Sequence, residues 1–298
     1  VGNSLNPRLI YADLSILKTA NVNCIRTSHY PQHSSLLKFA DEMGFLVIEE
    51  LPLINLTEEE LEDPHLLSNA QQQLWEMIHR DKNNCSVMGW ILADMEKSDS
   101  KKLPFFMNEL IQIGKELDPT RFFSVAIDDP LNSKLNNLVD FRSINIFKGW
   151  YNESQMDYSQ VSEYLKDIKS HLLNLEESTD STQSNDSLKK PVIISAFGSG
   201  AISGFKDFAN TFWSENYQYQ FLREYLERIR QQDYISGTIV WHFQDFRVST
   251  FGGYLDRPKT YNNKGIVDMN RNPKNSYYLI RDLYGYWDWA FTPQLKKA

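Results

Sequence analysis

The sequence predicts an α/β fold of the (β/α)8, or TIM, barrel type, with the first strand missing from the chain. Along 298 residues, seven short apolar segments alternate with longer amphipathic ones. Strands that are apolar on both faces, each followed by a helix, indicate parallel pairing beneath outer helices. One-sheet doubly wound folds usually have fewer strands, which favours the barrel. Residues 1–11 contain no strand pattern, so the first strand either lies upstream in a longer protein or is absent.

Each expected element has its own signal. The strand segments are short apolar runs rich in β-branched and aromatic residues. They are residues 23–28, 45–51, 86–93, 121–127, 141–147, 191–197 and 235–243. The helical segments carry apolar residues at three- and four-residue spacing. They are residues 11–21, 33–44, 67–82, a segment ending near 117, 160–175, 215–232 and 275–286. Gly44 supplies a C-cap, and Asp118-Pro119 ends the fourth helix.

We expect one domain over residues 1–298, because α/β barrels commonly reach this length and 41% hydrophobic residues allow a sizeable core. Residues 176–190 read EESTDSTQSNDSLKK, a polar, low-complexity stretch that cannot bury a core. Because this stretch lies between a helix and a strand, we interpret it as a disordered surface insertion within the domain.

Composition argues against several function classes. The formal net charge of -8 disfavours binding to nucleic acids and anionic membranes. No apolar run approaches the roughly 18 residues that span a bilayer. Cys24 and Cys85 are expected as buried thiols, and six scattered histidines show no metal-ligand spacing, so neither metal nor cofactor is expected. The N-terminus of this chain lacks a signal-peptide pattern, whereas four N-x-[ST] sequons favour a secretory or lysosomal origin.

Candidate site residues follow the predicted strands, because barrel sites form at the carboxyl ends of strands. The motif RTSHYP brings Arg26 and His29 to the first such end, although a loop closed by Pro31 explains it about equally well. Further polar and aromatic groups at strand ends are Glu49, Glu50, Asp94, Met95, Glu96, Lys148, Tyr151, Trp241 and Asp245. Tyr151 and Trp241 suggest a carbohydrate or another ligand with flat faces. The alternative is aromatic packing that closes the barrel mouth.

The ordered motifs resemble glycoside hydrolase family 2, and within it the β-glucuronidases. RTSHYP with LLKFADEMGFLVIEE, RDKNNCSVMGW, LDPTR, NIFKGWY, FWSENYQ, WHFQDF and NNKGIVDMNRNPKNS occur in the order of that family, over about residues 11–286. The resemblance implies a TIM barrel, a tendency to oligomerise, and jelly-roll and immunoglobulin-like domains upstream. It also implies that Asn262 and Lys264 bind the carboxylate of a uronic acid, which suits an amide and an ammonium as charge-assisted donors.

The two catalytic glutamates of that family are replaced in this chain. Retaining glycosidases need an acid/base and a nucleophile about 5–5.5 Å apart. The acid/base position holds Met95, beside Asp94 in place of Asn, and the nucleophile position holds Ala196. A thioether transfers no proton, and a methyl group forms no ester. Phe147 also replaces a family Tyr. A neighbouring acid, Asp94 or Glu96, could relocate the acid/base, but the nearest carboxylate downstream of Ala196 is Asp207.

These observations favour a catalytically inactive barrel that is retained to bind a β-glucuronide or uronic-acid glycan, or as a scaffold in an oligomer or larger assembly. The vestigial substrate-binding residues would be Asn262, Lys264, His29, Asp94, Tyr151 and Trp241. One alternative is an active hydrolase, or a barrel with other chemistry, that uses relocated groups. Its candidates are Asp94, Glu96, Glu50, His29 and Asp245. Another alternative is an engineered mutant, but Met95 and Asp94 together favour natural loss.

Overall fold

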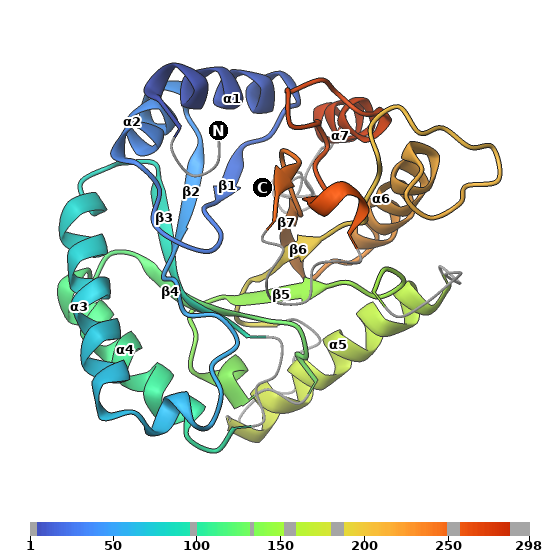
Figure 1. The fold of residues 1–298 in the computed structure, drawn as a ribbon. Helices are drawn as coiled ribbons and strands as arrows, with labels where there is room; N and C mark the ends of the chain where they lie inside the picture. The colour runs from blue at the N-terminus through green and yellow to red at the C-terminus, as the bar shows by residue number, and fades with distance from the viewer. Residues whose placement is uncertain are drawn as a thin grey trace, which may run out of the picture. The chain divides into compact units, whose positions relative to one another are not determined.

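The computed structural model describes residues 5–95, 100–131, 134–151, 159–179, 188–248 and 257–286. Seven strands form one parallel sheet in sequence order, β1 to β7 (Figure 1). Their bounds are β1 Cys24–Arg26, β2 Leu46–Glu50, β3 Val87–Met95, β4 Phe122–Ile127, β5 Arg142–Ile146, β6 Val192–Phe197 and β7 Ile235–Val240. All seven predicted strands are therefore confirmed.

The sheet curves until its first and last strands meet. Each strand pairs in parallel with the next in sequence, from Cys24 opposite Leu46 to Phe197 opposite Val240. β1 and β7, at the two ends of the sheet order, contact each other. The described residues thus form a nearly closed barrel of seven parallel strands, as expected for a TIM barrel that lacks one strand.

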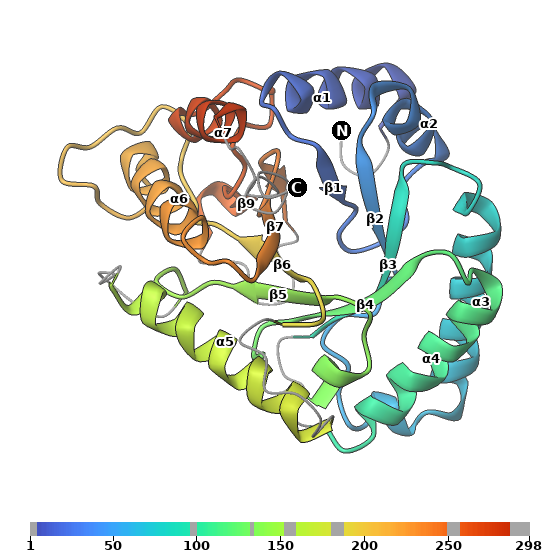
Figure 2. The ribbon, with the colours of Figure 1, turned by 180° about the vertical axis from the view of Figure 1, so that it is seen from behind.

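Helices lie outside these strands, as Figures 1 and 2 show from opposite sides. They are α2 (Ser34–Met43), α3 (Pro64–Asp81), α4 (Leu103–Leu117) and α5 (Ser159–Thr179), with short 3-10 turns η1 (Glu60–Glu62) and η2 (Lys134–Asn137). Gly44 ends α2 in the left-handed conformation, with φ of 71°, and Asp63 caps α3 through the His65 N–H. The predicted caps and helix order hold, and the ends shift by a few residues.

The barrel interior is filled by apolar side chains from successive strands. A buried cluster joins Ile48 of β2, Ile91 of β3 and Ala126 of β4 with Phe141. At the end of β6, Gly198 lies so close to β7 that an added Cβ would be 2.3 Å from the Trp241 carbonyl oxygen. This position therefore needs glycine for the two strand ends to approach each other.

The chain divides into two compact units. The barrel strands belong to the unit made of residues 24–199 and 221–242, and the other unit contains residues 1–23, 200–220 and 243–298. The second unit holds α1 (Pro7–Thr19), α7 (Asn275–Gly285), the 3-10 turn η3 (Pro258–Thr260) and the antiparallel pair β8 (Phe246–Arg247) and β9 (Tyr261–Asn262). α6 (Glu215–Ile229) begins in this unit and ends in the barrel unit. The expectation of a single domain stays a prediction.

Within the second unit, α1 is tied to the α7 end of the chain. The Arg271 guanidinium makes two hydrogen bonds to Asp13, of 2.6 and 3.0 Å, and the Tyr277 hydroxyl donates to the Ile16 carbonyl. Asn21, just past α1, donates to the Arg281 carbonyl at 2.8 Å. These bonds join segments about 260 residues apart and give the unit a defined structure.

Two expectations need correction or completion. Cys85 is exposed and not buried, because it lies in the turn before β3, whereas Cys24 is half-buried and burial raises the pKa of its thiol to about 12. In the predicted insertion, residues up to Thr179 continue α5, and Glu176 accepts the Lys189 backbone N–H at 2.8 Å. Residues 180–187 lie outside the described residues, so their disorder stays a prediction.

None of the described helices has the length and apolarity that a membrane crossing requires.

Candidate functional site

A buried arginine joins the carboxyl ends of five strands. Arg26, the last residue of β1, donates to Oε2 of Glu50 on β2 and to Oδ2 of Asp94 on β3, each at 2.6 Å. Its Nη1 also donates to Oδ1 of Asn145 on β5 at 3.2 Å and to the Ser195 carbonyl on β6 at 3.1 Å. We call these five residues the Arg26 network.

Charge in the Arg26 network is uneven, because one guanidinium faces two carboxylates. Burial alone would raise the pKa of Glu50, but Arg26 and then His29 hold it below its ordinary value. Burial would lower the pKa of Arg26, whereas Glu50 and Asp94 raise it. Asn145 completes the pairing, since its amide donates to Oδ1 of Asp94 at 2.9 Å and to Asp128 at 2.7 Å. Both carboxylate oxygens of Asp94 therefore have a donor within the network, Arg26 and Asn145.

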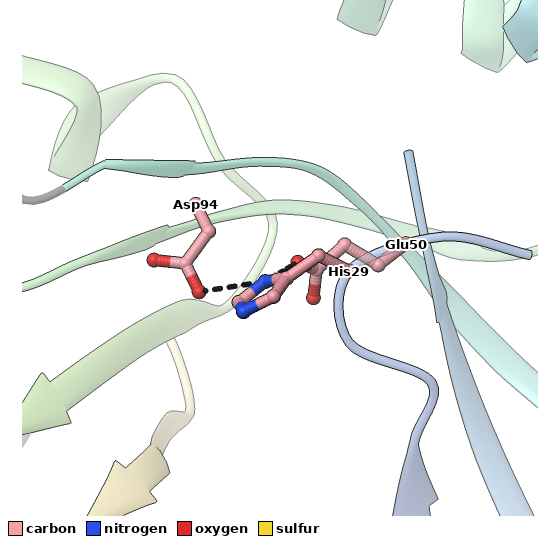
Figure 3. Close-up of side chains that lie close together, drawn as sticks. All are labelled: His29, Glu50 and Asp94. Atoms are coloured by element: carbon pink, nitrogen blue, oxygen red, sulfur yellow. Dashed lines mark hydrogen bonds and ion pairs between the residues drawn. The ribbon is translucent and has the colours of Figure 1, made fainter. Parts of the chain in front are cut away.

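His29 contacts both carboxylates of the network. Its Nδ1 lies 2.8 Å from Oε1 of Glu50 and 3.4 Å from Oδ2 of Asp94, so the ring stands between the two acids (Figure 3). The His29 side chain is 28% exposed, whereas that of Glu50 is fully buried. A buried carboxylate that holds an imidazole fixes the orientation of the ring. Trp241, just beyond β7, lies beside it with ring centroids 5.1 Å apart.

The residues His29, Glu50 and Asp94 offer one nitrogen and two carboxylate oxygens within 4.8 Å of one another, a set that can suit a divalent cation. However, Arg26 already bonds to both carboxylates. A cation there would lie beside a buried guanidinium, and like charges repel strongly where water is excluded. The cluster is better described as an ion network than as a metal site.

The two positions that the resemblance assigns to the catalytic glutamates, Met95 and Ala196, lie at the ends of β3 and β6. Met95 is 1% exposed and pairs in register with Ile127, and Ala196 is 2% exposed and pairs with Asn145. Neither side chain carries a titratable group. Glu96, the possible relocated acid, lies outside the described residues, so its role stays a prediction.

The aromatic candidates separate into two places. Trp241 joins His29, as described above. Tyr151 is about half exposed and contacts Phe147 edge-on, with ring centroids 5.4 Å apart. The ammonium of Lys148 lies 5.5 Å from the centre of the Tyr164 ring. Trp241 is thus part of the site at the strand ends, whereas Tyr151 stays near the end of β5.

Asn262, the last residue of β9, and Lys264, in the turn that follows it, belong to the second unit. Both side chains are buried, and the Lys264 backbone N–H donates to Oδ1 of Asn262 at 3.4 Å.

In the same unit, Asp245 pairs with the ammonium of Lys274 at 2.8 Å. Burial raises the pKa of Asp245 to about 6, although Lys274 and the Gly265 N–H oppose the rise. Asp207 bonds within its own loop, to Thr211.

Asn145, Ser195 and Asp128 were missed from the sequence. The Ser195 hydroxyl donates to Oδ1 of Asn145 at 2.9 Å and completes the set of contacts around Arg26. A signal was present, because a polar residue interrupts the apolar run of each strand: Asn145 in SINIF and Ser195 in VIISAF. Buried polar groups need partners, so such positions indicate a buried polar network.

Comparison with known proteins identifies the family to which this barrel belongs. The family model described as "Glycosyl hydrolases family 2, TIM barrel domain" matches residues 1–288. The chain belongs to glycosyl hydrolase family 2. Among curated relatives, the β-glucuronidase of Sus scrofa is 27% identical over 286 residues, with 95% of this chain and 41% of the relative covered. The human β-glucuronidase is 27% identical, with 95% and 41% covered.

Solved structures of family 2 enzymes have the same fold. A β-galacturonidase from Eisenbergiella tayi bound to galacturonate has a TM-score of 0.81 and 32% identity, with 95% of this chain and 48% of that chain covered. A β-glucuronidase from Ruminococcus gnavus in complex with D-glucuronic acid has a TM-score of 0.81 and 27% identity, with 94% and 46% covered. The chain therefore spans less than half the length of the family 2 proteins that it matches.

Proposed function

We propose that this family 2 barrel binds a uronic-acid glycan and does not hydrolyse it. The observation that carries the proposal is the pair of buried, non-ionisable side chains, Met95 and Ala196, at the ends of β3 and β6. Retaining glycosidases act through two carboxyl groups at the scissile bond. The neighbouring acid Asp94 cannot easily replace them, because Arg26 and Asn145 occupy its two oxygens.

The uronic-acid part of the proposal is supported by chemistry and by likeness. Asn262 and Lys264 supply an amide and an ammonium two residues apart, which are suitable donors for a carboxylate. The matched solved structures include family 2 enzymes bound to galacturonate and to D-glucuronic acid. The expected ligand class is a β-linked glycan that ends in a uronic acid.

A paired assay on the purified chain tests both parts. One arm measures hydrolysis of a chromogenic β-glucuronide, and the other measures binding of glucuronic acid by calorimetry. We expect binding without turnover, and loss of binding in Lys264→Ala. Turnover within about tenfold of an active relative would disprove inactivity, since loss of both catalytic groups lowers rates by several powers of ten.

A second candidate function, an assembly subunit, is favoured by one surface feature of the second unit. Phe208 is fully exposed and Phe205 is 41% exposed, on a loop whose backbone is fixed by Asp207 and Glu215. Exposed hydrophobic side chains that lie together in a patch can mark a contact surface. Light scattering of the chain and of Phe208→Asp tests this function: a larger species that Phe208→Asp converts to monomer supports it, and a monomer in both cases counts against self-assembly.

A further inference from the structure

Three buried polar side chains hold the turn of residues 262–265 in the second unit. Oδ1 of Asp245 accepts the Gly265 N–H at 2.9 Å, and Nζ of Lys274 donates to the Asn263 carbonyl at 3.0 Å. Nε2 of Gln218 donates to the Lys264 carbonyl at 3.3 Å and to the Gly265 carbonyl at 3.2 Å. We call Asp245, Lys274 and Gln218 the turn clamp.

All protons of the Lys274 ammonium are used within the protein. Besides the Asn263 carbonyl, Nζ donates to the Ala201 carbonyl at 2.7 Å and to Oδ1 of Asp245 at 2.8 Å. An ammonium has three N–H donors, so these acceptors satisfy it. The Lys274 side chain is fully buried. Lys274 therefore acts on the turn and not on a ligand.

The turn approaches Asp245 at a distance that excludes a side chain at position 265. A Cβ on Gly265 would lie 2.3 Å from the Asp245 backbone nitrogen and 2.6 Å from its Oδ1. Gln218, the third clamp residue, is itself held in place, because the Ser276 hydroxyl donates to its Oε1 at 2.7 Å. The clamp thus fixes the backbone on both sides of Lys264.

Stability alone does not explain the buried ion pair of Asp245 and Lys274. Burial raises the pKa of Asp245 to about 6 and lowers that of Lys274, so the protein environment disfavours the charged form of each. Replacement of a buried ion pair by apolar residues is often neutral or stabilising. A pair of this kind is more readily explained by the geometry that it imposes on the Lys264 turn.

We infer that Asp245, Lys274 and Gln218 are positioning residues that fix the Asn262 and Lys264 side chains for a uronate carboxylate. The inference rests on the proposed uronate binding. A carboxylate is recognised by donors at defined positions, so displacement of these donors weakens their charge-assisted hydrogen bonds to it. The clamp residues bond to the backbone of residues 263–265, so their effect on binding would pass through that backbone.

The test combines two readouts on the whole chain: amide hydrogen exchange of residues 262–265, and calorimetric binding of glucuronic acid and of methyl β-glucoside, which lacks the carboxylate. The variants are Asp245→Ala, Asp245→Asn and Gln218→Leu. The matched control is Gln244→Ala, because Gln244 is adjacent to Asp245 but donates to the Met269 carbonyl at 2.8 Å, outside the turn.

We expect Asp245→Ala and Gln218→Leu to speed exchange at Gly265. We also expect them to weaken the binding of glucuronic acid about tenfold or more, as loss of a hydrogen bond to a charged group predicts. Methyl β-glucoside and the control should change little. Asp245→Asn keeps an oxygen acceptor and should restore part of both effects. Gln218→Leu removes no charge, so it decides the test if Asp245→Ala fails to fold.

Unchanged exchange at the turn, or faster exchange with unchanged affinity for glucuronic acid, would overturn the positioning role. A wild-type chain that binds no glucuronic acid would instead refute the proposed function. In that case the exchange data alone still decide whether the clamp holds the turn.

Discussion

Asp94 lies 2.6 Å from the Arg26 guanidinium and, through its other oxygen, 2.9 Å from the amide of Asn145. The resemblance to β-glucuronidases implies a neutral Asn at this position, which would leave Arg26 with one carboxylate partner. In this chain Arg26 has two. The strand ends that carry glycosidase chemistry in the family are thus joined here by a buried ion network.

This pairing predicts that Asp94→Asn destabilises the barrel. Arg26 would lose one of its two charged partners but keep Glu50, so we expect a loss of about 1–3 kcal/mol in the free energy of unfolding, as for a buried hydrogen bond to a charged group. Urea denaturation measures it. Asp129→Asn, in a half-buried loop position, is the control. A variant as stable as wild type would show that Glu50 alone suffices.

The proposed inactivity is tested by placing glutamate at the two positions that the resemblance assigns to the catalytic carboxylates, Met95 and Ala196. We expect the double variant Met95→Glu/Ala196→Glu to gain measurable hydrolysis of a chromogenic β-glucuronide, and each single variant to gain far less, since the two groups act as a unit. A single variant as active as the double variant would show that another carboxylate already acts as the second catalytic group.

The stability of the barrel should also depend on pH through Glu49. This carboxyl is fully buried on β2, and burial first, then the neighbouring Asp81, raises its pKa to about 9 from an ordinary value of 4.5. Between pH 4.5 and about 9, the folded chain therefore keeps a proton on Glu49 that the unfolded chain releases. Stability attributable to this group is greatest below about 4.5 and falls as pH rises towards 9, by up to about 1.4 kcal/mol per pH unit.

Replacing Glu49 with Gln removes the titrating group and should flatten this dependence between pH 5 and 9. Glu60→Gln is the matched control, because Glu60 is exposed and accepts the Thr57 backbone N–H. Urea denaturation across this pH range distinguishes the two variants. An unchanged slope in Glu49→Gln would mean that Glu49 is ionised in the folded chain.

Gly198→Ala should destabilise the barrel by about 1–3 kcal/mol, the usual cost of overpacking. The added methyl would lie 2.3 Å from the Trp241 carbonyl oxygen and would force the ends of β6 and β7 apart. Gly237→Ala on β7 is the control, since its Cβ would make ordinary contacts with Ile193 at 3.8 Å. Thermal unfolding compares the two. Equal melting temperatures would contradict the close approach.

The sequence predicted the fold and the order of its elements well. Parallel barrel strands are apolar on both faces, so runs such as VIISAF are visible without knowledge of their neighbours. Local signals such as Gly44 and Asp118-Pro119 also marked helix ends correctly to within a few residues. β8 and β9 were missed, because two-residue strands carry no periodic pattern.

By itself, the sequence determined which groups are present: the apolar strands, the non-ionisable residues Met95 and Ala196, and the Asn262–Lys264 pair. Only the tertiary structure decided how the charged groups are used. Arg26 binds the carboxylates of Glu50 and Asp94, which lie 24 and 68 residues further along the chain. Lys274 binds Asp245, which lies 29 residues before it. A buried charge is costly unless it is paired with an opposite charge. The fold therefore brings such partners together in space, whatever their separation along the chain.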